Sequence, residues 1–391
     1  MQKFDFSPEE FIVEEIAQNG VVLEVGKQFS ASDFEALRTA KSDAATLEQN
    51  AGLHRGQWFS WFVLEKREWN TSQALGSIGS RMGVSKKRFD CAGNKDRNAI
   101  TVQLCSAFAI EPARILGVRV KDVKINGVFL ASSKVRLGDL QGNRFTITLT
   151  ERNCGKTPDA SAIGEKARSS DFLFPNFFGS QRFGSLRSNT AQVGELLLKN
   201  DLEGAVMNYL CFTGGEEADS ERETGATDAR KKLFEERDFE KALSYFPKHL
   251  KFERELLAHL AKHPKDFAGA LRMFPRHVLL LFVHAFQSQL FNEELQARIA
   301  EGVVPQEGIL GKIIGYDSEL DAGEKALLDL RGISVGDFKV RCFPEVSCKG
   351  TMRPLFAKMG GFEVLQKEPL VLRFSLGAGS YATVALEFLL S

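Results

Sequence analysis

Three adjacent residues, Lys95, Asp96 and Arg97, place one carboxylate between two cations just before a predicted strand over residues 99–104. Neighbouring positive charge keeps a carboxylate ionised at neutral pH, and an ionised carboxylate is a nucleophile. If the segment is extended, Asp96 points to one side, and Lys95 and Arg97 point to the other and hold phosphates. The alternative is a solvated loop whose exposed ion pair contributes little to stability.

A cluster of positive charge surrounds this triplet. Between residues 81 and 97 the chain has six cations and two acids. The cations are Arg81, Lys86, Lys87, Arg88, Lys95 and Arg97. The whole chain has 51 basic and 51 acidic residues, which argues against a protein that coats nucleic acid through its net charge. The local cluster predicts a track of phosphate contacts that leads to Asp96, and a solvated helix end is the alternative.

The segment around Asp96 resembles a known family. Residues 92–103, AGNKDRNAITVQ, are similar to the A-G-x-K-D-[RK]-x-A-x-T-x-Q signature of the TruD pseudouridine synthases. Further family motifs follow in the family's order: SPEEFIVEEI at 7–16, LQGNRFTITL at 140–149, PNFFGSQRFG at 175–184, QSQLFN at 287–292 and GSYAT at 379–383. The resemblance therefore covers almost the whole chain.

The resemblance implies an enzyme that isomerises a uridine of tRNA, by family uridine 13, to pseudouridine. The family's catalytic aspartate maps to Asp96. The reaction breaks the glycosidic bond, turns the base and rejoins it through carbon, with no cofactor and no metal. A carboxylate suits either attack on the sugar or addition to the base. The rival hypothesis is an RNA-binding or chaperone protein on the same fold without turnover.

The same resemblance implies the residues that bind the substrate. The uridine must be flipped out of its stack, and the family's stacking aromatic maps to Tyr381. Asn143 and Phe145 map to pocket positions of the G-N-x-F strand. Gln181 and Arg182 lie in a glycine-bracketed turn, where Arg182 either contacts phosphate or stabilises the loop. For Tyr381 and Phe145, simple packing in the core is the alternative.

The sequence departs from the family pattern at three places. Asp5 stands where the family has a basic residue, which weakens any claim for a cationic contact at that point. Gly377 replaces a proline before the GSYAT motif and removes a constraint on the approach to Tyr381. Phe177 replaces a tyrosine. None of these changes removes the candidate carboxylate.

The elements predicted from periodicity mix strands and helices without βαβ alternation. This pattern indicates an α+β fold with a mixed, largely antiparallel sheet flanked by helices. Strands are predicted at 57–64, at 99–104, at 143–149 and at the end of the chain, with a hairpin around Asn19-Gly20. Helices are predicted from the N-cap Thr71 to Gly83, at 189–199, at 248–262 and from Pro275 to Ala300. Residues 214–232 hold few apolar side chains and are predicted to form an exposed loop.

A chain of 391 residues is predicted to form two domains. The family resemblance implies a catalytic domain over residues 1–172 and 350–391, with a TruD-specific α/β module inserted at 173–349 and a positively charged cleft between them. Six cysteines without a C-x-x-C pair indicate reduced thiols, and no apolar run is long enough to span a membrane. We therefore expect a cytoplasmic monomer with tRNA as its partner.

Overall fold

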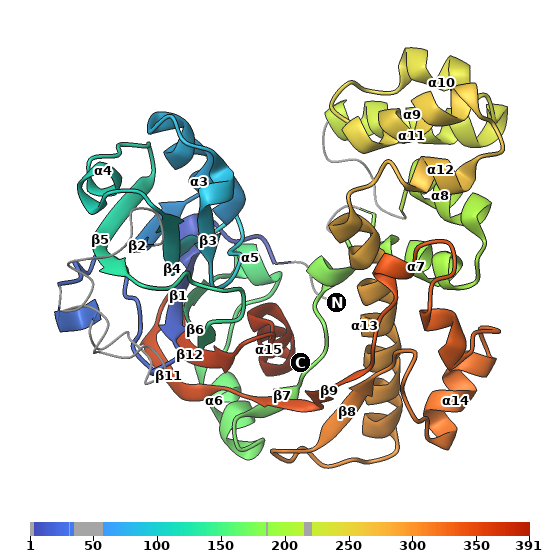
Figure 1. Cartoon of the computed structure of the whole chain (residues 1–391). Helices are drawn as coiled ribbons and strands as arrows, with labels where there is room; N and C mark the ends of the chain where they lie inside the picture. The colour runs from blue at the N-terminus through green and yellow to red at the C-terminus, as the bar shows by residue number, and fades with distance from the viewer. Residues whose placement is uncertain (1–3, 31, 35–57, 185–186, 215–220) are drawn as a thin grey trace. The chain divides into compact units, whose positions relative to one another are not determined.

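The computed structural model describes residues 4–30, 32–34, 58–184, 187–214 and 221–391 (Figure 1). The chain folds into two compact units. Unit 1 is Met1–Phe174 with Ala357–Ser391, and unit 2 is Pro175–Phe356. The assignment of an inserted module at 173–349 stays a prediction.

Unit 1 is built on one mixed sheet with the strand order β11-β12-β6-β1-β4-β2-β5, and β3 pairs with β4 beside this path. Within it β1 and β4 run parallel, whereas the other pairs are antiparallel. This confirms the predicted α+β class. The strands are β1 (Phe11–Ala17), β2 (Phe59–Arg67), β3 (Phe89–Cys91), β4 (Ile100–Phe108), β5 (Val123–Ala131), β6 (Leu140–Leu149), β11 (Gly360–Lys367) and β12 (Leu370–Gly377).

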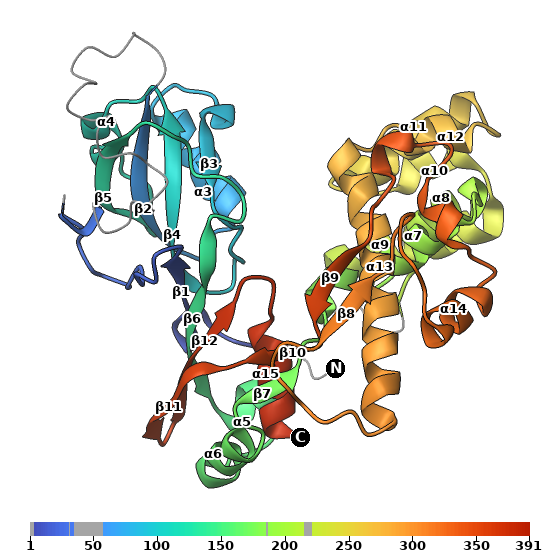
Figure 2. The ribbon, with the colours of Figure 1, turned by 60° about the horizontal axis from the view of Figure 1, so that its bottom comes forward.

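The two faces of the sheet are covered by different segments. Helix α3 (Thr71–Arg81) runs beside the sheet (Figure 2). It buries Ala74, Leu75 and Ile78 against alternate side chains of β2 and β4. The opposite side chains of these strands pack with Leu23 and the segment that follows β1. Further helices of unit 1 include α4 (Pro112–Leu116), α5 (Glu151–Cys154), α6 (Ala160–Ser169) and α15 (Ala382–Leu390), with 3-10 turns η1 (Pro8–Glu10) and η3 (Lys86–Arg88).

Strand β4 is buried on both sides because both faces of the sheet are covered there. Every residue from Thr101 to Ala107 is buried, including Thr101 and Gln103, which are polar. The alternation in residues 99–104 therefore predicts the strand correctly but does not mark a solvent face. Buried polar side chains need hydrogen-bonding partners, which makes this strand a place to look for a functional site.

Unit 2 is mostly helical. Its helices are α7 (Thr190–Leu198), α8 (Leu202–Cys211), α9 (Glu221–Glu236), α10 (Phe239–Tyr245), α11 (Lys251–Lys262), α12 (Phe267–Leu271), α13 (Arg276–Ala300) and α14 (Ala322–Asp329). Short elements complete it: η4 (Ser180–Phe183), β8 (Leu310–Ile313), η5 (Val335–Phe338), η6 (Pro344–Val346) and β9 (Thr351–Pro354). Strands β7 (Leu173–Pro175) and β10 (Phe356–Lys358) pair with each other.

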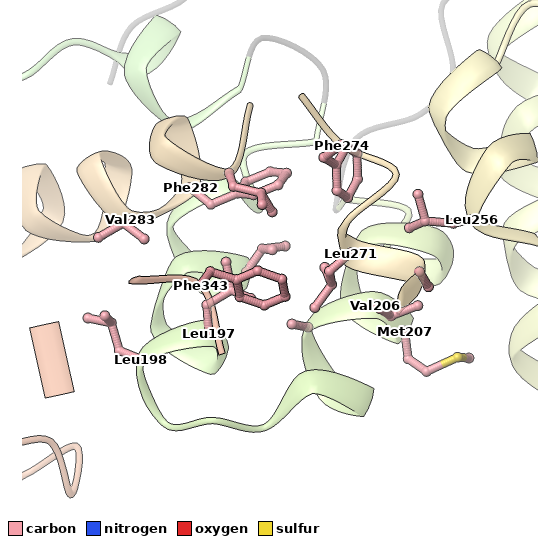
Figure 3. Packing of buried hydrophobic residues seen from close by; sticks show 14 of the residues in the cluster. Leu197, Leu198, Val206, Met207, Leu256, Leu271, Phe274, Phe282, Val283 and Phe343 are labelled. Carbon is pink, nitrogen blue, oxygen red and sulfur yellow. The ribbon is translucent and has the colours of Figure 1, made fainter. Parts of the chain in front are cut away.

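The core of unit 2 joins side chains from α7, α8, α11, α12 and α13. Figure 3 shows Phe274, Phe282 and Phe343 among leucines of these helices. Helix α7 crosses α13 at Gly194, where a Cβ atom would overlap the carbonyl oxygen of Phe282. Glycine at this position therefore lets the two helix backbones approach each other directly. The structure confirms the helices predicted at 189–199, at 248–262 and after Pro275.

Two predicted elements are wrong. An exposed loop is expected at residues 214–232, but α9 begins at Glu221 and buries Ala226, Ala229 and Leu233 at helical spacing. Two of these three buried side chains are alanines, which is why the apolar face escapes a search for large side chains. Residues 215–220 of this segment lie outside the described residues.

The expected strand at the end of the chain is helix α15. Its apolar residues are buried at Ala382, Ala385, Leu386 and Leu389, a three- and four-residue spacing that fits a helix rather than alternation. Tyr381 is therefore the residue before a helix and not part of a strand. The preceding strand, β12, ends at Gly377.

Two local predictions need smaller corrections. The N-cap of α3 is Asn70, whose side chain accepts a hydrogen bond from the Gln73 amide at 2.8 Å, and not Thr71. After the turn at Gly20, Val22 forms only an isolated bridge with Ile16, so the predicted hairpin is a turn with one strand. The strand predicted at 57–64 is β2, although residue 57 lies outside the described residues. No helix within the described ranges is long and apolar enough to cross a membrane.

Candidate functional site

The turn between β3 and β4 carries Asp96 at its surface. The Asp96 and Arg97 side chains are exposed, whereas the neighbouring Lys95 side chain is only 6% exposed. The extended geometry expected from the sequence is therefore wrong for this segment, because Lys95 and Arg97 do not share a side. Arg97 donates from Nε to the carbonyl oxygen of Glu68 at 3.2 Å, which leaves its other donors available.

Lys66, at the end of β2, lies beneath this turn and is 1% exposed. Its ammonium donates to the carbonyl oxygen of Asp96 at 2.9 Å, more weakly to that of Lys95 at 3.4 Å, and also to that of Trp69. One buried cation thus joins two backbone segments: Trp69, just before α3, and the turn at Lys95 and Asp96. Burial lowers the pKa of Lys66 to about 8, and the Asp96 carboxylate acts in the opposite direction.

Two further buried side chains fix the turn from the α3 side. The Thr71 hydroxyl accepts from the Lys95 amide at 2.9 Å and donates to Gln103 Oε1 at 2.8 Å. The Gln103 side-chain amide in turn donates to the carbonyl oxygen of Gly93 at 2.8 Å. Thr71 and Gln103 therefore find their partners in each other and in the backbone of the turn, as buried polar groups generally must.

A buried ion pair ties the turn to β1. Lys95 Nζ lies 2.7 Å from Glu15 Oε2, and these side chains are 6% and 1% exposed. The second oxygen of Glu15 accepts from the Leu104 amide of β4 at 2.9 Å. Burial raises the pKa of the Glu15 carboxyl, whereas the Lys95 ammonium favours its ionised form. Lys95 is therefore engaged inside the protein and is not presented to a phosphate.

Strand β6 lies next to β1 in the sheet and β12 lies next to β6, and their register places defined residues in line with Glu15. Glu15 of β1 lies opposite Asn143 of β6, and Asn143 lies opposite Leu376 of β12. A Cβ atom on the adjacent Gly142 would overlap the carbonyl oxygen of Leu376, so glycine at this position permits the two strands to approach. Asn143 thus lies opposite Glu15, the residue that holds Lys95 of the Asp96 turn.

Three buried polar atoms lack a partner within the part of the chain that the structure describes. One is Arg230 Nε of unit 2, and the two in unit 1 are Asn143 Oδ1 and Thr101 Oγ1. The register places both on the face of the sheet that carries Glu15 and Gln103, on strands to either side of β1. Buried polar atoms without partners are uncommon in folded proteins. We therefore regard this face, next to the Asp96 turn, as the candidate binding surface for a polar ligand.

Phe145 belongs to a continuous row of aromatic rings. Its ring centroid lies 6.0 Å from that of Phe11 and 5.9 Å from that of Phe374, and its side chain is buried. These contacts join β1, β6 and β12. Packing alone accounts for the position of Phe145. Phe145 lies two residues after Asn143 in β6, so its packing also holds the part of the strand that carries Asn143.

The remaining candidate residues fall in both units. Tyr381 is half-buried in unit 1, after a turn in which the Ala378 amide donates to the Gln141 carbonyl of β6 at 3.1 Å. Gln181 and Arg182 lie in η4 of unit 2. Gln181 is exposed, and Arg182 donates from Nε to Ser288 Oγ at 3.0 Å. The structure thus gives Arg182 a stabilising contact within its own unit.

Four residues of this site, Lys66, Thr71, Gln103 and Glu15, are not identified from the sequence. A lysine at the end of an apolar strand fits a solvated strand end, and a glutamate in β1 fits the polar half of an alternating pattern. The available signal is Gln103, because a polar residue in a central strand requires a buried partner.

Known proteins are similar in sequence to this chain along most of its length. The family model for tRNA pseudouridine synthase D (TruD) matches residues 3–321 and 308–388. A curated relative from Methanopyrus kandleri, named probable tRNA pseudouridine synthase D, is 35% identical over 347 residues, which are 84% of each chain. A relative from Methanocaldococcus jannaschii, named probable tRNA pseudouridine synthase D 1, is 32% identical over 97% of this chain and 93% of its own length.

A solved structure is also similar to this chain in its fold. The crystal structure of a TruD protein from Methanosarcina mazei superposes with a TM-score of 0.69 at 26% sequence identity. It covers 100% of this chain and 93% of the other.

The buried ion pair makes a prediction for stability. Glu15→Gln leaves the Lys95 ammonium buried without a counter-charge, so the free energy of unfolding should fall by about 3–5 kcal/mol. Tryptophan fluorescence in urea reports this loss in unit 1, because all three tryptophans (Trp58, Trp61 and Trp69) belong to it. The control is Glu9→Gln, which breaks an exposed ion pair with Arg67 and should cost less than about 1 kcal/mol. Equal losses in the two variants would refute the role of the buried pair.

Proposed function

The chain belongs to the TruD family of pseudouridine synthases, which are isomerases, and from that premise we propose that it converts a uridine of tRNA to pseudouridine with Asp96 as its catalytic carboxylate. By family, the target is uridine 13. The observation that carries the proposal is the state of the turn. Asp96 is the exposed acid of a segment whose backbone is fixed from below by Lys66, Thr71 and Gln103.

A fixed, exposed carboxylate suits this reaction because the same oxygen must attack and later leave. The bond between uracil N1 and the sugar breaks, the base turns, and a bond forms between uracil C5 and the sugar. Asp96 attacks either the sugar carbon or a carbon of the base, and both routes use one ionised carboxylate. The hydrogen on C5 leaves as a proton as the product forms, and N1 takes up a proton, so the isomerisation needs no oxidant or reductant. Holding the carboxylate in the geometry of attack removes much of the entropic part of the barrier.

The unpartnered oxygen of Asn143 supports recognition of uracil on the same face. Asn143 Oδ1 is a buried acceptor without a donor among the described residues. Uracil offers a donor at N3, whereas neutral cytosine has an acceptor there. We propose that Asn143 accepts from this N–H after the nucleotide has flipped out of its stack. Leaving such an acceptor unpaired disfavours the wrong base, which gives selectivity without many contacts.

Other residues contribute to holding the RNA. Tyr381 stacks on the flipped base, and Phe145 supports the strand that carries Asn143. Arg97 offers its free donors to a phosphate, and we propose phosphate contacts for Gln181 and Arg182 from unit 2. Lys95 is assigned a structural role instead, because Glu15 holds its ammonium. We propose that the protein works as a cytoplasmic monomer.

Replacing the carboxylate tests the proposal. Asp96→Asn keeps the size of the side chain, and the contacts that fix the turn go to the backbone, so the fold should survive. Formation of pseudouridine should fall by ~10³-fold or more, because the reaction loses its nucleophile. The measurement is release of tritium from tRNA transcripts labelled at uridine C5. Filter binding should show a tRNA affinity within about threefold of that of the unaltered protein.

The same experiment separates the enzyme from a binding or chaperone protein on this fold. A chain that only binds RNA releases no tritium before or after the substitution. Turnover retained by the Asp96→Asn protein would assign catalysis to another residue.

Tyr381 is tested by removing its ring. Tyr381→Ala should lower the single-turnover rate by about 5- to 150-fold, which corresponds to a stacking contribution of roughly 1–3 kcal/mol. The control Tyr381→Phe keeps the ring and should stay within about threefold of the unaltered rate. If alanine and phenylalanine behave alike, the stacking role is wrong.

A further inference from the structure

A pocket lined by arginines lies at the C-terminal end of α3 in unit 1. Its volume is about 440 Å³, and its lining consists of Arg81, Met82, Arg114, Gly117, Val118 and Arg119. No carboxylate belongs to this lining. Glu111, the residue before α4, is the nearest acid to Arg114 in the sequence and is also outside it. We call this feature the arginine pocket.

The arginines are held in place by contacts that leave most of their donors unused. Arg114 donates from Nη2 to the Met82 carbonyl at 2.8 Å, and Arg119 donates from Nη1 to the Leu116 carbonyl at 2.7 Å. A guanidinium has five N–H groups, so further donors remain on each side chain. None of the three forms an ion pair with an acid in the part of the chain that the structure describes.

The pocket is connected to the Asp96 turn by helix α3. Arg81 ends this helix, whereas Thr71 begins it and binds the Lys95 amide. Ten residues of helix separate these points by about 15 Å. The Lys86 side chain runs back along the helix past Gly76 and reaches the Ser72 hydroxyl. Cations thus lie at both ends of α3, one group in the pocket and one beside the turn.

This arrangement changes the expectation of a continuous phosphate track over residues 81–97. Arg88 lies apart from the pocket, because its guanidinium is anchored to the carbonyl oxygens of Phe108 and Ala109 and is not part of the pocket's lining. Lys95 is buried with Glu15. Arg81 lines the pocket at one end of α3, whereas Lys86 reaches the Ser72 hydroxyl near the other end.

We propose that the arginine pocket binds a backbone phosphate of the tRNA substrate, a few nucleotides away from the uridine that reacts at Asp96. Guanidinium groups match the oxygens of a phosphate with paired hydrogen bonds. The negative end of the α3 dipole opposes an anion, but it amounts to about half a charge against three full positive charges. The inference rests on the proposed function, because it assigns a second contact to the same RNA.

The test is the double variant Arg81→Gln with Arg119→Gln, which retains Arg114 and its contact with Met82. The dissociation constant of full-length tRNA transcripts should rise by about tenfold or more at 0.1 M salt. In a plot of the logarithm of the dissociation constant against the logarithm of the salt concentration, the slope should become less steep by about one to two. The rate at saturating tRNA should remain within about twofold, because the pocket is remote from the reacting atoms.

The matched control removes two charges elsewhere in unit 1. Arg168 and Lys367 are both exposed. The double variant Arg168→Gln with Lys367→Gln should bind tRNA with a salt slope close to that of the unaltered protein. The Arg81 side chain forms no hydrogen bond or ion pair within the described residues, so Arg81→Gln alone should leave the fold intact. This single variant should make the salt slope less steep by about one.

The outcomes are distinct. Weaker tRNA binding and a smaller slope in the pocket variants alone support the proposal. Unchanged tRNA binding in the pocket variants, or an equal loss of binding in the control, overturns the proposal. A pocket that binds free anions instead of tRNA would leave tRNA binding unchanged. If the unaltered protein forms no pseudouridine in tRNA, the proposed function fails, whatever the pocket variants show.

Discussion

The site depends on one buried cation that holds the backbone of a surface turn. Lys66 donates its hydrogen bonds to carbonyl oxygens, including that of Asp96, and forms no ion pair with a carboxylate in the described part of the chain. A buried ammonium is unfavourable unless its donors are satisfied, and here the turn satisfies them. The consequence is reciprocal: the lysine tolerates burial because the turn has this shape, and the turn keeps this shape because the lysine is there.

The rest of unit 1 extends this constraint across the sheet. Glu15 accepts from Lys95 on the turn and from the Leu104 amide of β4, and its place in β1 sets it opposite Asn143. At Gly142, β6 and β12 lie in close contact, and Tyr381 follows four residues after the end of β12. The proposed nucleophile, base acceptor and stacking ring therefore come from segments that share one register. A slip of one residue would turn Asn143 to the other face.

The sequence predicts the family and the position of the Asp96 turn better than it predicts the buried side chains that hold this turn. The motif around Asp96 identifies the turn and the family, and the periodicity of 143–149 predicts strand β6. Lys66 and Glu15 could not be predicted, because their burial follows from tertiary packing on both faces of the sheet and not from local pattern. For the same reason Lys95 was assigned to phosphate. The end of the chain was misread because a short apolar run fits a strand or a buried helix equally well.

Lys66 holds the backbone of Asp96, and the single-turnover rate of Lys66→Met at saturating tRNA tests most directly whether this contact positions the carboxylate. The control is Lys124→Met, a lysine of β5 that is 69% exposed and pairs with Glu65. The account predicts a loss on the order of 100-fold for Lys66→Met with tRNA affinity retained, because a displaced carboxylate misses its geometry of attack. A rate within about twofold of the control, with the fold intact by tryptophan fluorescence, would contradict it.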